Sequence, residues 1–367
     1  MRICWVDNAK AIGIILVVYG HMAECGTLAK EIIFSFHMPL FFFLSGYLVK
    51  DNRIRLPLSS FLKINFRCLI VPYFSFWVFS YLLWLPTRML RNQAFHSSQS
   101  LFDPVIGLFC GISYKLYVNP VLWFFPCLFI VRLVFWWLHK RLNYGELISA
   151  IIMMPILGIV MHRILPFRLP WSIDSALVAI FFYGCGYAAA RTRILEKSES
   201  VTLRVGLASL MLALLTLWVR ESWHVEMALM DLGNYAFFFT AAGLGIVMTI
   251  YISKLLPPSA VCRWLSKNTI IIFPYHRLAF NVFTGIGVVF FGLQIDFKDT
   301  LFFSFLFTAG ALLSSVPVVF IIRRYMPWVA GLSSGPVQPI QQLKPAALQF
   351  KEYLGIAVES KKNKPCK

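Results

Sequence analysis

Apolar stretches long enough to cross a lipid bilayer recur along most of the chain, and this repetition restricts the possible folds more than any other feature. A hydrocarbon core ~30 Å thick requires about 20 mostly apolar residues in an α-helix. Because 59% of the 367 residues are hydrophobic and the mean hydropathy is +0.72, the chain carries more apolar surface than a soluble domain can bury. The sequence predicts an all-α, polytopic integral membrane bundle.

Ten such stretches predict one membrane domain over residues 1–325, followed by a flexible basic tail at 326–367. Arg2 precedes the first stretch, but its charged flanks and the A-E-C-G after it do not match a cleaved signal peptide, so the N-terminus is expected to stay. The ten spans are predicted near 9–23, 32–49, 66–86, 119–138, 147–165, 174–191, 203–220, 235–256, 269–293 and 300–322.

The lysines and arginines predict how the bundle is oriented. With a cytoplasmic N-terminus most of them fall in inner segments, which also places the C-terminus in the cytoplasm and favours the cytoplasmic (inner) membrane. The net charge of +18 is then mainly a topology signal, and no nucleic-acid-binding signature accompanies it. The eight cysteines are scattered without a C-x-x-C pair, so neither a disulfide framework nor a metal site is expected.

The first predicted span carries a polar stripe on an otherwise apolar helix. Asp7 and Lys10 are one turn apart, and the eleven steps from Lys10 to His21 return to within ~20° of the same face, ~16 Å further along. An ionisable residue facing lipid costs ~2.5–3.5 kcal/mol or more. The stripe is therefore expected to face a partner or an aqueous cavity.

The second span contains a histidine beside a helix break. Pro39 leaves the carbonyl of Ser35 without its helical donor, which is tolerated at membrane depth where protein or water compensates. His37 is thus expected to face a cavity or a neighbouring helix. The alternative is a histidine that is simply hydrogen-bonded inside the bundle.

Lys63 and Arg67 lie four residues apart, on one face at the start of the third span. Free N–H groups of a helix start would suit phosphates at this cytoplasmic mouth. Positive-inside sorting alone also explains these charges.

Later segments supply further candidates. Trp123, at the outer end of the fourth span, either stacks on a sugar ring or belongs to an interfacial aromatic belt. His276 and Arg277 follow Pro274 near the middle of the ninth span, which favours a cavity lining over simple packing. The segment 101–119 either shapes an outer entrance or is a plain loop, and the acidic outer loop from Arg220 to Asp231 is interpreted as solvated.

The order and spacing of several motifs resemble the acyltransferase-3 family, nearest to its fucose 4-O-acetylase-like branch. The resemblance spans most of residues 1–325. The motifs are D-x-x-K opening the first span and G-H closing it, F-H-M-P-L-F-F-F-L-S-G-Y-L, R-C-L-I-V-P-Y, L-W-F-F-P-C-L-F, F-F-Y-G-C-G-Y and L-S-K-N-T-I-I-I-F-P-Y-H.

This resemblance implies a ten-helix membrane enzyme that moves an acyl group, usually acetyl from acetyl-CoA, onto an extracytoplasmic carbohydrate such as a surface polysaccharide or its lipid-linked precursor. Asp7, Lys10 and His21 match the acidic, basic and histidine positions of its first helix, and Arg67 matches an arginine of the third. Many members carry a second arginine just before it. Here Asn65 stands in that region, with Lys63 as the nearest cation.

The chemistry needs a base for the acceptor hydroxyl and donors for the tetrahedral oxyanion. His21 is assigned as general base, with Asp7 as a further catalytic residue and with Tyr19 or another group fixing its tautomer. His37, Trp123 and His276 are candidate oxyanion donors; Trp123, His276 and Arg277 are assigned to the acceptor. No Ser-His-Asp or G-x-S-x-G pattern is present, which favours direct transfer over a covalent intermediate.

The same assignments give a geometric hypothesis. Lys10, Lys63 and Arg67 would hold the CoA phosphates on the cytoplasmic side, and the pantetheine arm would reach across the bilayer to His21. Two other classes stay open from the residues alone, a lipid-linked glycan transporter and a glycan polymerase. The sequence specifies neither the acceptor hydroxyl nor acetyl over another short acyl donor.

Overall fold

A computed structural model describes residues 3–22, 28–95, 100–196, 200–220, 224–292 and 300–332, without the side chains of 87–95 and of Arg220. These residues belong to one compact unit. The predicted tail beyond Leu332 lies outside them.

Every regular element in the described ranges is helical, apart from one isolated bridge between Glu226 and Asp231. The long helices are α1 (Cys4–Gly20), α2 (Leu28–Tyr47), α5 (Val71–Phe95), α7 (Phe124–Arg141), α8 (Tyr144–Ile164), α9 (Ile173–Thr192), α10 (Val201–Arg220), α11 (Tyr235–Leu255), α12 (Ala260–Phe291) and α13 (Leu301–Tyr325). The shorter ones are α3 (Asp51–Ile54), α4 (Leu58–Asn65), η1 (Phe66–Ile70), α6 (Asp103–Cys110), η2 (Ser113–Lys115), η3 (Pro120–Trp123), η4 (Pro170–Ser172), η5 (Ile194–Glu196) and η7 (Pro327–Ala330).

The polytopic helical bundle predicted from the sequence is confirmed. Each predicted span coincides with one long helix, and eight spans in the described residues are long and apolar enough to cross a membrane. The other two helices are α1, with 17 residues, and α12, whose middle carries His276 and Arg277. These two helices carry five of the polar candidates that the sequence singled out, since Asp7, Lys10 and His21 lie in or directly after α1 and His276 and Arg277 lie in α12.

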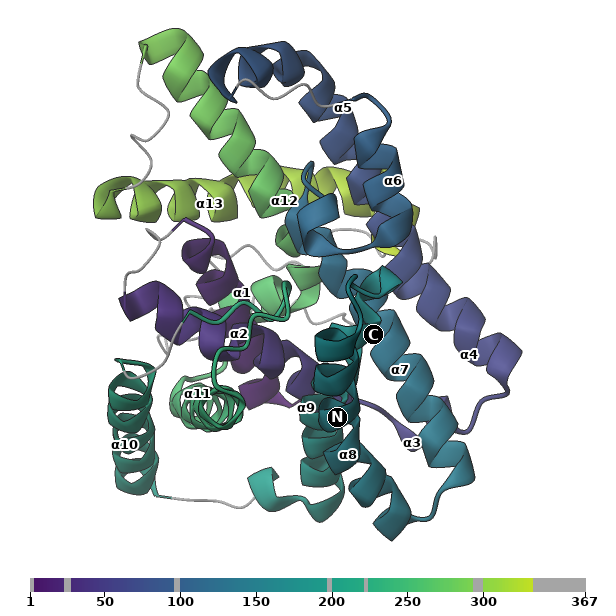
Figure 1. The fold of residues 1–367 in the computed structure, drawn as a ribbon. Helices are drawn as coiled ribbons and strands as arrows, with labels where there is room; N and C mark the ends of the chain where they lie inside the picture. The colour runs from purple at the N-terminus through teal and green to yellow at the C-terminus, as the bar shows by residue number, and fades with distance from the viewer. Residues whose placement is uncertain are drawn as a thin grey trace, which may run out of the picture. The chain divides into compact units, whose positions relative to one another are not determined.

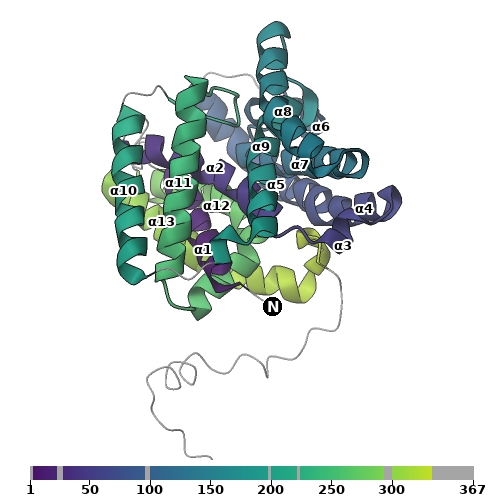
Figure 2. The same cartoon turned by 90° about the horizontal axis from the view of Figure 1, so that it is seen from below.

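The first two helices lie at the centre of the bundle. Helix α1 packs against α2, α11 and α12, and α2 also packs against α9 (Figure 1). Helix α10 lies beside α11 at the periphery (Figure 2), and few of its side chains are buried. Polar side chains on α1 and α2 are therefore surrounded by protein, as the cost of exposing them to lipid requires.

Helices α2 and α9 approach each other until their backbones touch. A Cβ atom on Gly46 would lie 1.9 Å from the carbonyl oxygen of Tyr183, and one on Gly186 would lie 2.0 Å from that of Phe43. Only glycine permits this distance at both positions, as is usual where membrane helices pack closely. The two helices therefore meet backbone to backbone at Gly46 and Gly186.

Asn119 joins the segment before α7 to two other helices. Its side-chain amide is fully buried and donates to Ser80 Oγ at 3.0 Å and to the Pro274 carbonyl at 3.1 Å. These bonds fix η3, and with it Trp123, against the kink of α12. The segment 101–119 is consequently ordered, with α6 and η2 folded beside η3.

The chain after α13 continues into η7, which packs on α5 near the π-helical turn η1. A Cβ on Gly331 (φ +67°) would lie 2.2 Å from the Arg67 carbonyl oxygen, so this contact requires glycine. The first residues predicted as tail therefore belong to the folded unit up to Leu332.

Candidate active site

One pocket gathers most of the residues predicted to handle the acceptor. It has a volume of about 250 Å³ and is lined by His21, His37, Trp123 and Arg277. Helices α1, α2, α12 and the η3–α7 junction contribute these side chains, and the loop before α11 closes one side. Candidates from spans far apart in the sequence thus meet at one place.

His21 lies at the C-terminal end of α1, partly exposed to this pocket. Its Nδ1 is 2.8 Å from the Val17 carbonyl oxygen. Because a carbonyl can only accept, Nδ1 carries the proton and the lone pair of Nε2 remains available. The partner that fixes the tautomer is therefore Val17 of the same helix, whereas Tyr19 packs on Phe305 at 5.2 Å between ring centroids.

Two more histidines surround His21. The ring centroid of His276 lies 5.0 Å from that of His21, and the centroid of His37 lies 6.3 Å away. His37 is almost completely buried and its Nδ1 lies 2.8 Å from the Ile33 carbonyl oxygen, so its Nε2 is also an acceptor in the neutral ring. His276 is fully buried, and neither ring nitrogen makes a hydrogen bond of normal geometry within the described chain, although the backbone of Ile272 and Phe273 in its own helix is close to the ring.

An unsatisfied buried imidazole is unusual, since buried polar groups are normally hydrogen-bonded. His276 lies between His21 and the Phe280 ring, at 5.5 Å from the latter. His276 is absent from the pocket lining, so it packs behind His21 instead of lining the cavity as the sequence favoured.

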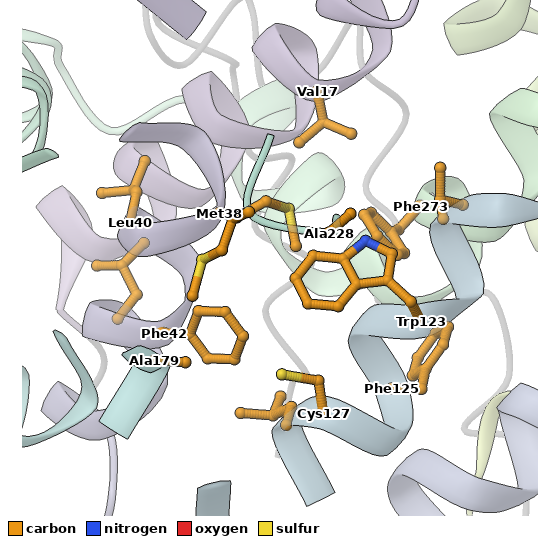
Figure 3. Close-up of a cluster of buried hydrophobic side chains, with 14 of the residues drawn as sticks. Val17, Met38, Leu40, Phe42, Trp123, Phe125, Cys127, Ala179, Ala228 and Phe273 are labelled. Carbon is orange, nitrogen blue, oxygen red and sulfur yellow. The ribbon is translucent and has the colours of Figure 1, made fainter. Parts of the chain in front are cut away.

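Apolar side chains form the inner wall of the pocket. Trp123, Phe273 and Met38 line it and belong to the buried core beneath it (Figure 3). Trp123 is 4% exposed, so it is a wall of the pocket rather than part of an exposed belt at the bundle surface. The guanidinium-bearing Arg277 lines the same pocket.

Sequence reasoning missed two charged residues in the lining, Lys30 and Glu226. Glu226 belongs to the loop interpreted as solvated. That loop is held in place because Arg168 donates to the Ala228 carbonyl at 3.3 Å and Ser175 Oγ donates to the Met227 carbonyl at 3.1 Å. No local pattern in the sequence revealed these long-range bonds.

The remaining candidates lie at the opposite ends of the helices. Asp7 accepts a hydrogen bond from Ser266 Oγ at 2.7 Å, which ties α1 to α12. Fourteen helical steps place Asp7 roughly 21 Å from His21. Lys10 is on the same inner half, and neither residue lines the pocket. The structure thus does not bring Asp7 together with His21.

Lys63 and Arg67 are exposed on α4 and η1, and the Arg67 guanidinium donates to the Leu332 carbonyl at 2.6 Å. A π-helical turn of this kind is often found at functional sites. Arg132 of α7 donates to Asn65 Oδ1 at 3.1 Å. A second guanidinium therefore reaches the place where the chain has asparagine instead of arginine.

Aromatic rings separate the two groups of residues. The Phe124 ring centroid lies 5.1 Å from that of Phe42, 6.3 Å from that of Phe41 and 5.3 Å from that of Phe273. Phe42 and Phe273 are each about one turn closer to the inner end than His37 and His276. Lys10, Lys63 and Arg67 are absent from the pocket lining, so the pocket does not extend past these rings to the three cations.

No group of three or more His, Cys, Asp or Glu side chains in the described ranges is arranged to hold a metal ion. Comparison with curated proteins and with solved structures finds no match. The family model for the acyltransferase domain, however, matches residues 3–324, which include all the helices that form the pocket. The chain is therefore a multi-pass membrane protein of the acyltransferase-3 family and an acyltransferase, not the glycan transporter or polymerase that the sequence left open.

Proposed function

We propose that this acyltransferase moves an acetyl group from cytoplasmic acetyl-CoA to a hydroxyl of an extracytoplasmic carbohydrate, with His21 as the general base. The observation that carries the proposal is the meeting of His21, His37 and Arg277 around one pocket, with His276 packed beside His21, at the end of α1 that is far from Asp7 and Lys10. By the positive-inside rule this end is extracytoplasmic, in the cytoplasmic membrane.

The tautomer of His21 suits base catalysis. With Nδ1–H bonded to Val17, Nε2 takes the proton of the acceptor hydroxyl as its oxygen attacks the thioester carbonyl. Collapse of the tetrahedral intermediate breaks the C–S bond. The proton then passes to the CoA thiolate, so the base is regenerated and no covalent enzyme intermediate is needed.

The other groups divide between oxyanion and acceptor. Arg277, Trp123 Nε1–H and His276 are the proposed donors for the oxyanion, because His37 in its neutral form uses its only N–H on Ile33. His37 instead is proposed to accept a hydrogen bond from the acceptor. Trp123 also offers an apolar face for a sugar ring.

The donor phosphates are proposed to bind at the inner end, on Lys10, Lys63 and Arg67. Arg132, which contacts Asn65, is proposed to supply the planar guanidinium for the phosphates, because the ammonium group of Lys63 lacks that two-pronged hydrogen-bond geometry. Asp7, bonded to Ser266, holds α1 against α12 at this end. For the thioester to reach His21, the pantetheine arm must displace the ring of Phe124 from Phe42 and Phe273.

The test uses membranes that contain the protein and their own glycans. Labelled acetyl-CoA is added, and incorporation is compared for wild type, His21→Gln and the control His139→Gln, which changes a histidine bonded to Tyr187 far from the pocket. We expect His21→Gln to lower transfer by about 10²–10⁴-fold, the usual contribution of a general base. Unchanged transfer with His21→Gln would refute the assignment.

A further inference from the structure

A second cavity, away from the histidine pocket, lies on the membrane-exposed side of the bundle. It is an apolar groove of about 390 Å³ between α8 and α11, with α9 beneath it. Helices α8 and α11 lie on either side of α9 (Figure 2). The lining includes Ile152, Ile156, Val160, Phe181, Phe239 and Tyr235. Only the tyrosine among them carries a polar side-chain atom, so the groove suits a hydrocarbon chain.

The outer end of the groove carries a positive charge. Arg163, in the last turn of α8, donates from Nε to Tyr235 Oη at 2.9 Å, and its guanidinium lies over that ring at 5.7 Å from the centroid. The side chain is exposed, and its two terminal NH₂ groups have no partner in the described part of the chain. A fixed guanidinium with two free donors is suited to a phosphate.

The groove is connected to the histidine pocket through a short series of contacts. His162, next to Arg163, lies 3.7 Å from Asp174, and Asp174 accepts from Arg168 Nη2 at 3.1 Å. Arg168 in turn donates to the carbonyl of Ala228, a residue that lines the pocket. The same loop continues from Ala228 into Tyr235 at the start of α11. A series of contacts thus links the charged end of the groove to the loop that lines the pocket.

We propose that this groove binds the acceptor as a lipid-linked glycan. The isoprenoid chain occupies the groove, its phosphate rests on Arg163, and the attached sugar reaches the pocket of His21. A bilayer phospholipid fits the apolar surface equally well but brings no glycan hydroxyl to the pocket. The binding site stands on the groove and Arg163, whereas its role as acceptor site rests on the proposed function.

The experiment measures lipid binding by the purified full chain in detergent with native mass spectrometry. The probes are decaprenyl phosphate and, for comparison, dioleoyl phosphatidic acid. Ile156→Trp fills the groove, and Leu157→Trp is its matched control, since Leu157 is similarly exposed on α8 but does not line the groove. Arg163→Gln removes the charge, with Arg141→Gln as control.

We expect Ile156→Trp and Arg163→Gln each to weaken decaprenyl phosphate binding by about tenfold. Ile156→Trp would displace the hydrocarbon chain from the groove, and Arg163→Gln would remove one charge-assisted contact with the phosphate. Leu157→Trp and Arg141→Gln should bind like the wild type. If Ile156→Trp does not fold, Arg163→Gln decides alone. Equal affinity for both lipids in the wild type, or equal loss with the controls, overturns the proposal.

His21→Gln separates this proposal from the proposed function. It should bind decaprenyl phosphate like the wild type while losing transfer. If the His21→Gln protein still transfers acetyl while the Arg163→Gln protein no longer binds decaprenyl phosphate, the assignment of His21 as base is wrong and the groove is supported as a lipid site. If transfer requires His21 but the Ile156 and Arg163 variants bind decaprenyl phosphate like the wild type, the groove is not the lipid site. The assignment of His21 as base then still stands.

Discussion

The two ends of the bundle differ in how their polar residues are held. At the end that carries the pocket, His21 and His37 each use one ring nitrogen on their own helices and keep the other available, while His276 packs beside His21 behind the pocket lining. At the inner end Asp7 and Arg67 are bonded to groups on other elements. The outer end is thus arranged for proton transfer and the inner end for holding charge.

A layer of aromatic side chains lies between these two ends. Phe41, Phe42, Phe124 and Phe273 come from helices interrupted by Pro39 or Pro274 or from the 3-10 to α junction before α7. Interrupted helices can adjust locally where a regular helix cannot. The layer therefore separates the two halves at rest and lies where a donor arm would have to pass. Four changes test this comparison.

The largest effect is expected at the outer end from His276→Phe. Removing an imidazole that is proposed to donate to the charged intermediate should lower turnover by roughly 10–150-fold, the range of one hydrogen bond to a charged group. Initial rates with labelled acetyl-CoA should show the loss in kcat and not in the KM for the donor. A raised KM for acetyl-CoA with a normal kcat would instead indicate that His276 contributes to binding the donor.

A structural effect is expected in the inner half from Gly46→Ala. The new Cβ would meet the Tyr183 carbonyl, so overpacking should destabilise the protein by about 1–3 kcal/mol. Gly243→Ala is the matched control, because nothing lies within 4 Å of a Cβ on that helical glycine. Thermal unfolding in detergent compares the two, and an equal midpoint would show that α2 and α9 separate easily.

At the inner end Arg67→Gln and Arg132→Gln should each raise the KM for acetyl-CoA by about tenfold without changing kcat, since each removes one guanidinium from a phosphate. The control is Arg141→Gln, which alters an exposed arginine that stacks on Trp137. Equal KM values for the Arg67 and Arg141 variants would disprove the donor assignment.

The smallest change is expected from Phe124→Ala, which removes the central ring of the aromatic layer. Cys127 lies one turn further along α7 and is fully buried. Local opening should let a water-soluble thiol reagent reach it a few-fold faster than in the wild type, as read from labelled peptides. Labelling at the wild-type rate would mean that other side chains close the layer.

Much of the fold was predictable because apolar length determines membrane spans directly. The ten predicted spans coincide with the ten long helices, and the family resemblance was confirmed, although its fucose 4-O-acetylase branch is not resolved. The branch, the acceptor and the acetyl donor stay predictions.

The site was predictable only in part. The pocket gathers His21, His37 and Arg277, which each broke an apolar pattern, and Trp123, which stood out as an aromatic residue at the end of a span. Asp7 shares a helix face with Lys10 and His21, but the rise of the helix places it roughly 21 Å from His21. Glu226 was missed because its place depends on bonds from Arg168 and Ser175, and such long-range contacts leave no local signal.

The most direct test of the account asks from which side the donor is used. Inverted vesicles, with the cytoplasmic face outward, and right-side-out vesicles from the same cells receive labelled acetyl-CoA, which does not cross membranes. The account predicts that label enters the glycans of the inverted vesicles only, and that His21→Gln removes this incorporation. Label entering the glycans of right-side-out vesicles at the same rate would contradict it.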